Sequence, residues 1–145
     1  MKPILIVFEG VDKSGKTTLK DKFNKRTNFS YVVLDRLTTS SKIYNNFFGR
    51  NRIEYYEEFE KSVLKNFNLL VVLCECNTEE IAKRLERTNE KLPEQLKDID
   101  KVKTAFVEEV ERSFTNYIVI NTENQIDECV DAIIKRIKEM ENSNE

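Results

Sequence analysis

Two of the three glycines in the chain fall within one short stretch, Gly10–Thr18, which has the sequence GVDKSGKTT and follows the first apolar run, Ile4–Phe8. The stretch fits the pattern G-x-x-x-x-G-K-[ST], and it has the strand before it and the helical period after it that this pattern requires. In such a loop the glycines let backbone amides turn toward a phosphate group, and the following helix adds the positive end of its dipole. The pattern predicts a phosphate-binding loop between a strand and a helix, which restricts the fold to the α/β class.

Four short apolar runs divide the chain, and each is continuous rather than alternating, as is typical of strands covered on both faces. They are Ile4–Phe8, Tyr31–Leu34, Leu69–Cys74 and Tyr117–Ile120. Apolar residues at helical spacing lie between and after these runs. This alternation predicts a three-layer α/β/α domain around a short parallel sheet of about four strands, whose ligands bind beyond the carboxyl ends of the strands.

Length and local punctuation indicate how these elements are grouped. A chain of 145 residues is of the size at which one hydrophobic core is normal, so we expect a single domain over residues 1–140 and a frayed tail over residues 141–145. Thr78 and Asn124 precede helical periods and are predicted helix starts, whereas Gly49 follows two phenylalanines and is a predicted helix stop.

The charges argue against several kinds of partner. There are 24 Lys and Arg residues against 26 Asp and Glu residues, which gives a net charge of −2 with the two signs interspersed. Such a surface offers no general electrostatic attraction to nucleic acid or to anionic lipid, so we expect neither nucleic acid nor a membrane as a partner. The apolar run after Met1-Lys2-Pro3 is too short for a signal peptide or a spanning helix, so we expect a cytoplasmic protein.

The chain contains no histidine. This excludes nucleophiles activated by a Ser-His or Cys-His pair, and it removes the usual zinc partners of cysteine. The three cysteines, Cys74, Cys76 and Cys129, are an odd number without a zinc-site spacing. We therefore expect reduced, structural thiols.

The phosphate loop itself indicates a nucleotide and a metal. Lys16 would bridge the β- and γ-phosphates, and Thr17 would offer its hydroxyl to Mg²⁺, so ATP and Mg²⁺ are the expected cofactors. The residues expected to bind the nucleotide are Gly10, Asp12, Lys13, Ser14, Gly15, Lys16, Thr17 and Thr18. The loop does not identify the acceptor, because water, a nucleotide, a nucleoside or a polynucleotide end can all receive the γ-phosphoryl group.

Two segments carry a family resemblance. Phe8–Thr18, FEGVDKSGKTT, closely resembles the phosphate loop of thymidylate kinases, in which a glutamate before the first glycine and an aspartate two residues after it are distinctive. Leu34–Tyr44, LDRLTTSSKIY, resembles the D-R-x-x-x-S-x-x-A-Y stretch of the same family. More weakly, Tyr55–Phe67, Leu69–Cys74 and Thr78–Arg87 resemble its helix, strand and arginine-bearing lid helix. The resemblance implies a P-loop kinase fold and a small-molecule nucleotide substrate.

The resemblance also implies roles for individual residues. Asp12 would hold the 3′-hydroxyl of the acceptor sugar, and Lys13 would neutralise Asp12 and reach the γ-phosphate. Tyr44 would lie against the deoxyribose, and Ser40 and Ser41 fall where the acceptor base is approached. A tyrosine that only packs in the core is the alternative for Tyr44.

Two more residue pairs complete the predicted site. Asp35 follows a strand and could order Mg²⁺-bound water, while Arg36 could clamp the phosphate of a monophosphate acceptor. Arg84 and Arg87 lie three apart on one helical face and could close over the phosphates. Alternatively, Glu80 could pair with Arg84 on a solvated surface. The predicted catalytic set is Lys16, Lys13, Arg36, Asp35, Arg84 and Arg87, with Thr17 and Asp35 at the metal.

The chain also departs from the family. Its first helix ends near Arg26 and the D-R strand already begins at Tyr31, so some sixty residues that the resemblance implies are absent, including the thymine-reading segment. Thymidine specificity therefore does not carry over. The base site would be more open, be completed by Phe47, Phe48 or Tyr55, or be filled by a partner subunit.

The many cations favour an acceptor that is already anionic, because such an acceptor needs positioning and neutralisation rather than a base. We therefore predict ATP- and Mg²⁺-dependent transfer to a deoxynucleoside monophosphate. Glu9, Asp12 or Asp35 could instead serve a hydroxyl, which leaves a deoxynucleoside kinase or a polynucleotide 5′-hydroxyl kinase as the alternative. A non-catalytic nucleotide-binding module is the third interpretation. The resemblance also allows a homodimer.

Overall fold

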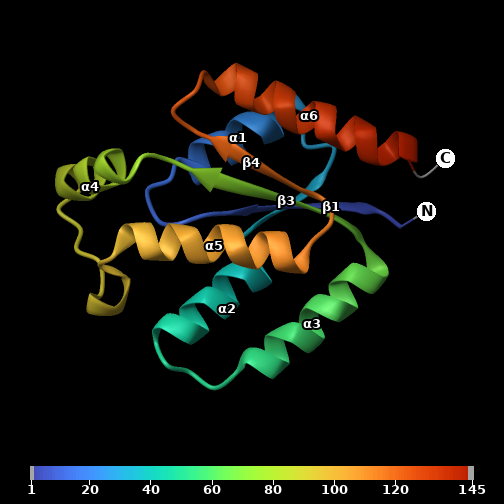
Figure 1. The fold of residues 1–145 in the computed structure, drawn as a ribbon. Coiled ribbons are helices and arrows are strands. Elements are labelled where there is room, and N and C mark those ends of the chain that lie inside the picture. The colour runs from blue at the N-terminus through green and yellow to red at the C-terminus, as the bar shows by residue number, and fades with distance from the viewer. Residues whose placement is uncertain (1, 144–145) are drawn as a thin grey trace.

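A computed structural model describes residues 2–143 and shows one parallel sheet with the strand order β2-β1-β3-β4 (Figure 1). The strands are β1 (Ile4–Glu9), β2 (Val32–Asp35), β3 (Asn68–Glu75) and β4 (Tyr117–Asn121). Each strand lies within one residue of a predicted apolar run at both ends. The predicted short parallel sheet is confirmed.

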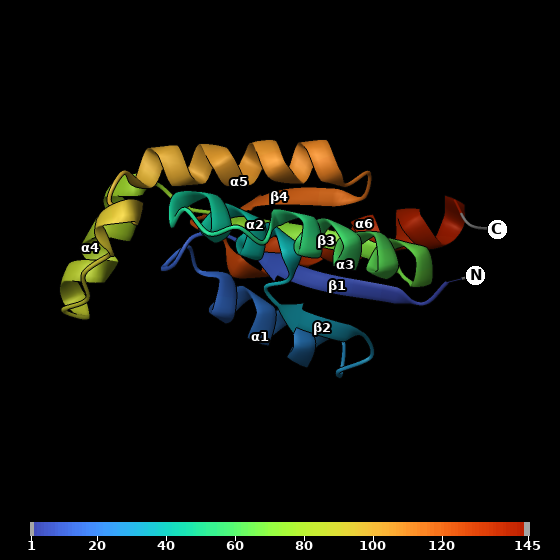
Figure 2. The same cartoon turned by 90° about the horizontal axis from the view of Figure 1, so that it is seen from below.

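Helices cover both faces of the sheet (Figures 1 and 2). They are α1 (Lys16–Arg26), α2 (Thr38–Phe47), α3 (Ile53–Asn66), α4 (Thr78–Arg87), the short 3₁₀ turn η1 (Glu94–Leu96), α5 (Ile99–Ser113) and α6 (Ile126–Ser143). Ile6 and Phe8 of β1 pack under α1 and α6, whereas Leu5 and Val7 face α2, α3 and α5. The fold is the predicted three-layer α/β/α arrangement.

The strands are not equally buried. In the central strands β1 and β3, residues such as Phe8 and Val72 have no exposed surface. The outer strands are open, and Val32 of β2 is 62% exposed. The prediction that all four runs are covered on both faces is wrong for β2 and β4, because both are edge strands and the helices pack over the centre of the sheet.

The helix boundaries confirm some predictions and correct others. Gly49 follows α2 with a φ of 65°, as a helix stop should. The cap of α4 is Asn77, not Thr78, because the Asn77 side chain accepts a hydrogen bond from the Glu79 amide at 2.8 Å. Helix α6 continues to Ser143, so residues 141–143 are helical rather than frayed, and residues 144–145 lie outside the described part of the chain.

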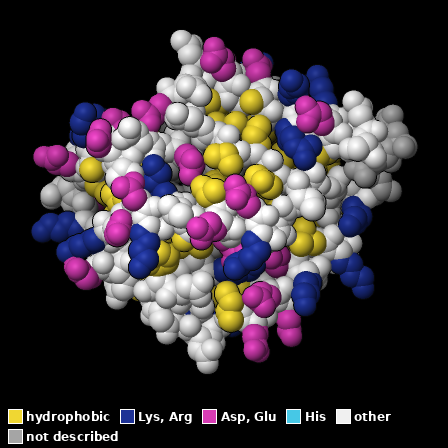
Figure 3. Space-filling view, in the orientation of Figure 1, with side chains coloured by type: hydrophobic (Ala, Val, Ile, Leu, Met, Phe, Trp, Pro, Cys, Tyr) yellow, Lys and Arg dark blue, Asp and Glu magenta, His cyan; other side chains and the backbone are white. Residues whose placement is uncertain are grey.

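In the described residues, the surface charges are mixed and the cysteines are free, as the sequence predicts. Basic and acidic side chains are intermixed over the face drawn in Figure 3. No helix between residues 2 and 143 combines the length and apolar character needed to cross a bilayer. Cys74, Cys76 and Cys129 are free and buried, and burial raises the pKa of all three thiols, that of Cys74 to about 12. Such thiols are unreactive at neutral pH.

Candidate active site

The loop between β1 and α1 adopts a backbone that its glycines make feasible. Gly10 has a φ of 146° and Gly15 a φ of 87°. A Cβ atom on Gly10 would lie 2.5 Å from the carbonyl oxygen of Cys74, and one on Gly15 would lie 2.8 Å from the hydroxyl oxygen of Thr122. Both positions therefore exclude a side chain, for conformation and for space.

The start of α1 is open to an anion. Gly15 occupies its N-cap position without a side-chain hydrogen bond, and no acidic residue lies in the first turn. Gly15 therefore offers no side-chain acceptor to the free amides of this turn. The hydroxyl of Ser14 is buried and lacks a hydrogen-bond partner among the described residues. An uncapped helix start beside an unpaired buried donor fits a phosphate group.

Lys16 and Asp35 face each other across this loop. The parallel register pairs Phe8 with Asp35, which brings the end of β2 beside the loop. There the Lys16 ammonium group donates a hydrogen bond to the Asp35 carboxylate. Partial burial pushes the pKa of Asp35 upward, but the charges of Lys16, Lys20 and Arg36 outweigh it and hold that pKa below its usual range. Asp35 is therefore ionised and orients Lys16.

The donor set for a metal is small. No group of three or more His, Cys, Asp or Glu side chains suited to a metal occurs within residues 2–143. Thr17 lines the pocket beside the loop, and Asp35 is engaged by Lys16. This set fits Mg²⁺, which proteins bind through one or two side chains together with substrate phosphates and water.

Arg36 gathers the residues predicted to bind the acceptor. Its backbone is left-handed, with a φ of 69°, and its amide donates to the Phe8 carbonyl at 2.9 Å. The guanidinium group donates to the Ser40 hydroxyl at 2.7 Å and to the Asp12 carboxylate at 2.8 Å. It also lies 5.6 Å from the centre of the Tyr44 ring. Four residues predicted from two separate motifs thus form one cluster.

Tyr44 and Ser41 have structural contacts as well. The Tyr44 ring packs edge-on against Phe48 and Phe106, so this residue has the core contacts of the alternative interpretation and also contacts the site. The Ser41 hydroxyl donates to the Leu37 carbonyl at 3.0 Å.

Glu9 is a buried residue that holds Ser40 of the Arg36 cluster in place. It has no exposed surface, and its carboxylate accepts hydrogen bonds from the amides of Leu37 and Ser40, at 2.9 and 3.3 Å, and from the Ser40 hydroxyl. Burial raises the pKa of Glu9, although these hydrogen bonds oppose the shift. Because Glu9 is enclosed, it cannot reach a substrate hydroxyl as a base. It joins the end of β1 to the start of α2 and orients Ser40.

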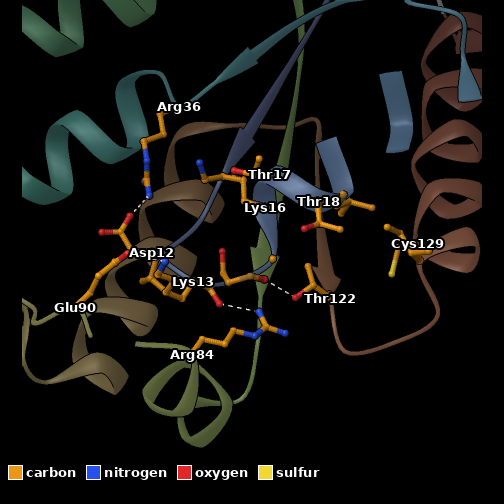
Figure 4. A pocket seen from close by; sticks show the side chains of 15 residues that line it. Asp12, Lys13, Lys16, Thr17, Thr18, Arg36, Arg84, Glu90, Thr122 and Cys129 are labelled. Atoms are coloured by element: carbon orange, nitrogen blue, oxygen red, sulfur yellow. Dashed lines mark hydrogen bonds and ion pairs between the residues drawn. The ribbon is translucent and has the colours of Figure 1, made fainter. Parts of the chain in front are cut away.

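The lid helix α4 contributes one of its two predicted arginines. Arg84 donates to the Lys13 carbonyl at 2.8 Å and lines the pocket beside the phosphate loop (Figure 4). It also pairs with Glu80 at 3.2 Å, as the alternative interpretation predicts. Arg87 is 66% exposed, lies 3.7 Å from Glu80 and does not line the pocket. The structure therefore does not bring Arg87 into the site.

The Lys13 ammonium group is held by a residue that sequence reasoning missed. It lies 2.9 Å from the carboxylate of Glu90, in the loop after α4. Thr122, which donates to the Ser14 carbonyl, and Cys129 also line the pocket unforeseen. None of these three belongs to a pattern that could have indicated it.

Two pockets adjoin at this cluster. The first pocket, of about 830 Å³, contains the phosphate loop and is shown in Figure 4. The second pocket, of about 440 Å³, lies between α2 and α3. It is lined by Arg36, Leu37, Thr38, Ser40, Ser41, Tyr44, Arg50, Tyr55, Tyr56 and Phe59. Among the described residues, Arg36 alone lines both pockets.

A parallel α/β sheet with a glycine-bearing loop after its first strand, and an arginine cluster at the end of the neighbouring strand, is typical of α/β proteins that bind phosphorylated ligands at the carboxyl ends of their strands. The family model for thymidylate kinase matches residues 28–133, so the chain belongs to the thymidylate kinase family. No curated protein matches the chain in sequence.

Three solved structures share the fold. The YorR protein from Bacillus subtilis, in complex with phosphorylated GDP, is 22% identical over 95% of this chain and 98% of its own, with a TM-score of 0.71. Thymidylate kinase from Candida albicans is 15% identical over 97% and 93%, with a TM-score of 0.63. Deoxyadenosine kinase from M. mycoides, with bound dATP, is 12% identical over 95% and 100%, with a TM-score of 0.60.

Proposed function

We propose that the protein transfers the γ-phosphoryl group of ATP to a deoxynucleoside monophosphate in the presence of Mg²⁺. The observation that carries this proposal is the position of Arg36 between the two pockets. A guanidinium group at that junction can hold an acceptor phosphate in forked geometry beside the phosphate loop. In the structure this group is paired with Asp12, whose carboxylate an incoming acceptor phosphate would displace.

The reaction asks little covalent chemistry of the protein. ATP bound with Mg²⁺ supplies the phosphoryl group and part of the charge neutralisation. An acceptor phosphate oxygen bonds to the γ-phosphorus while the bond to the β–γ bridging oxygen breaks, and ADP leaves. A monophosphate acceptor is already anionic, so no proton has to be removed. The work of the protein is positioning and electrostatic stabilisation.

Roles follow from where the side chains lie. Lys16 and Lys13 of the loop and Arg84 of α4 line the first pocket. They would stabilise charge on the moving phosphoryl group. Thr17 and Asp35 would hold Mg²⁺. The acceptor sugar would lie against Asp12 and Tyr44, which are both within reach of Arg36, as the family resemblance implies.

The structural relatives support a nucleotide substrate in general. They include a thymidylate kinase, a deoxyadenosine kinase with bound dATP and a protein in complex with phosphorylated GDP. These proteins share the fold but involve different bases and different acceptors. The likeness therefore supports phosphoryl transfer between nucleotides and leaves the base to the pocket of this chain.

The test is an acceptor screen with variants. The protein is incubated with ATP, Mg²⁺ and each common nucleoside, nucleoside monophosphate and 5′-hydroxyl oligonucleotide, and the phosphorylated product is identified. We expect a deoxynucleoside monophosphate to gain a phosphate, and Arg36→Ala to lower turnover at least about tenfold. Arg87→Ala is the matched control, because its side chain lies outside both pockets. Full turnover in folded Arg36→Ala would contradict the acceptor assignment.

One observation favours a second candidate, a deoxynucleoside kinase. Of the three carboxylates considered as a base, Glu9 is enclosed and Asp35 is engaged by Lys16, but Asp12 is exposed beside Arg36. A carboxylate there could accept the proton of a hydroxyl. Transfer in the same screen to nucleosides only, abolished by Asp12→Asn, would establish this candidate. ATP binding without any transfer would indicate a binding module.

A further inference from the structure

The far wall of the second pocket is aromatic and open to solvent. Tyr55 is 57% exposed and Phe59 is 45% exposed, and both lie in the first half of α3 with Tyr56 beside them. Large apolar rings that line a pocket yet remain in contact with water are typical of ligand-binding surfaces. The opposite wall carries Arg36, with Ser40 and Tyr44 of α2.

Planar groups are stacked along this rim. The guanidinium carbon of Arg52 lies 4.7 Å from the centre of the Tyr55 ring and 6.0 Å from that of Tyr56. Arg50 lies 5.0 Å from the ring centre of Phe48. Rings and guanidinium planes in such an arrangement form a platform on which a flat heterocycle can stack.

The wall is held in place from behind. One turn after Tyr56, the buried Glu60 carboxylate lies 2.7 Å from the Lys42 ammonium group and accepts a hydrogen bond from the Thr38 hydroxyl. Lys42 also lies 3.7 Å from Glu109 of α5. These contacts fix α3 against α2 and α5, so the pocket is already formed before a ligand binds.

Position and size suit one part of a nucleotide. Because Arg36 lines both pockets, a phosphate held there would leave the rest of an acceptor to extend between α2 and α3. The volume of about 440 Å³ is within the range of roughly 300–1,000 Å³ common for small-molecule sites.

We propose that the second pocket receives the purine or pyrimidine base of the acceptor, stacked against Tyr55 and Phe59. This inference rests on the proposed function, which identifies the acceptor as a nucleotide. Helix α3 thereby takes over a task that the thymidylate kinase resemblance gives to a segment absent from this chain. Since every base offers a flat face, stacking selects for a base but discriminates little between bases.

Binding without ATP tests this directly. Calorimetry compares the four common deoxynucleoside monophosphates with 2-deoxyribose 5-phosphate, which has the same phosphate and sugar but no base. We expect the four nucleotides to bind within about tenfold of one another, and the sugar phosphate to bind at least about tenfold more weakly. Tyr55→Ala and Phe59→Ala should each weaken nucleotide binding roughly tenfold and leave sugar phosphate binding unchanged.

Phe29→Ala is the matched control, because Phe29 is an exposed phenylalanine in the loop between α1 and β2, outside the pocket. Its binding should equal that of the parent protein. In steady-state kinetics, the two α3 variants should raise KM for the acceptor and leave KM for ATP unchanged. Unchanged thermal unfolding checks that the exposed substitutions leave the fold intact.

The inference would be overturned if Tyr55→Ala and Phe59→Ala bound nucleotide as tightly as the parent protein, or if the sugar phosphate bound as tightly as the nucleotides. A preference above about a hundredfold for one base would also overturn it, because stacking alone does not supply such selectivity. Base-dependent binding that needs Tyr55 and Phe59, but without phosphoryl transfer in the acceptor screen, would support the base site and overturn the proposed function alone.

Discussion

The two adjoining pockets are built in different ways. The first depends on backbone: Gly10 and Gly15 shape the loop, and the amides at the start of α1 face the space where phosphates would bind. The second depends on side chains from two helices that meet only after folding. The phosphate loop of the first pocket is therefore encoded in nine consecutive residues, whereas the second pocket requires the packing of α2 against α3. We therefore expect substitutions in the first pocket to change turnover or ATP binding, and substitutions around the second pocket to change KM for the acceptor.

The largest effect is expected from Lys16→Ala. Loss of the ammonium group beside the loop should lower turnover on the order of 10³-fold, equivalent to about 4 kcal/mol, because charge on the moving phosphoryl group loses a stabilising partner. Circular dichroism should show an intact fold. Lys25→Ala, an exposed lysine in the last turn of α1, is the control and should keep full activity. Equal losses in both variants would contradict a local role for Lys16.

Glu60→Ala tests whether the buried contacts between α2 and α3 maintain the second pocket. The substitution removes the nearer carboxylate partner of the buried Lys42 ammonium group, which should lower the free energy of unfolding by about 3 kcal/mol. Denaturant titration measures this change. At a temperature where the variant remains folded, KM for the acceptor should rise while ATP affinity stays the same. Glu57→Ala, exposed on the same helix, should change neither quantity.

Gly10→Ala tests the backbone of the first pocket. The added methyl group meets a backbone carbonyl oxygen at 2.5 Å, so the loop has to shift, and we expect a loss of about 2 kcal/mol together with weaker ATP binding. Gly49→Ala also places a side chain at a positive φ, in this case 65°, but no atom lies within 4 Å of the added methyl group. It should therefore cost only the conformational part, about 1 kcal/mol, and leave ATP binding unchanged. Equal effects would show that space is not limiting at Gly10.

The smallest effects concern two carboxylates with opposite pH dependence. Burial raises the pKa of Glu9 above its ordinary value of 4.5, so its contribution to stability is complete below that pH and declines as the pH rises through the native pKa. The charges around Asp35 lower its pKa below the ordinary 3.8, so its contribution is present above that pH and is lost as the pH falls through the native pKa.

Unfolding titrations across pH should separate these two groups. Glu9→Gln should remove a decline of stability on the alkaline side of pH 4.5, and Asp35→Asn should remove a decline on the acid side of pH 3.8. The same pH profile in the parent protein and in either variant would contradict the corresponding shift.

Sequence reasoning succeeded where the chemistry is local. Apolar runs located the strands because burial in a parallel sheet demands continuous hydrophobicity. The D-R motif predicted that Arg36 lies near the phosphate loop, and it does, since the parallel register fixes the end of β2 beside that loop. Glu90 and Thr122 were missed because their positions depend on how distant loops close over the site. Arg84 and Arg87 lie three residues apart on one helix, so their sequence positions do not distinguish them. Tertiary packing brings Arg84 to the Lys13 carbonyl and leaves Arg87 exposed.

The open edge of the sheet bears on how such enzymes change in evolution. The chain passes from α1 to the outer strand β2 through a short loop, and β2 pairs with β1 on one side only. An insertion at this loop can lengthen the sheet outward without moving β1, the phosphate loop or α1. Phosphoryl chemistry and base recognition can therefore be gained, lost or exchanged as separate parts of one kinase.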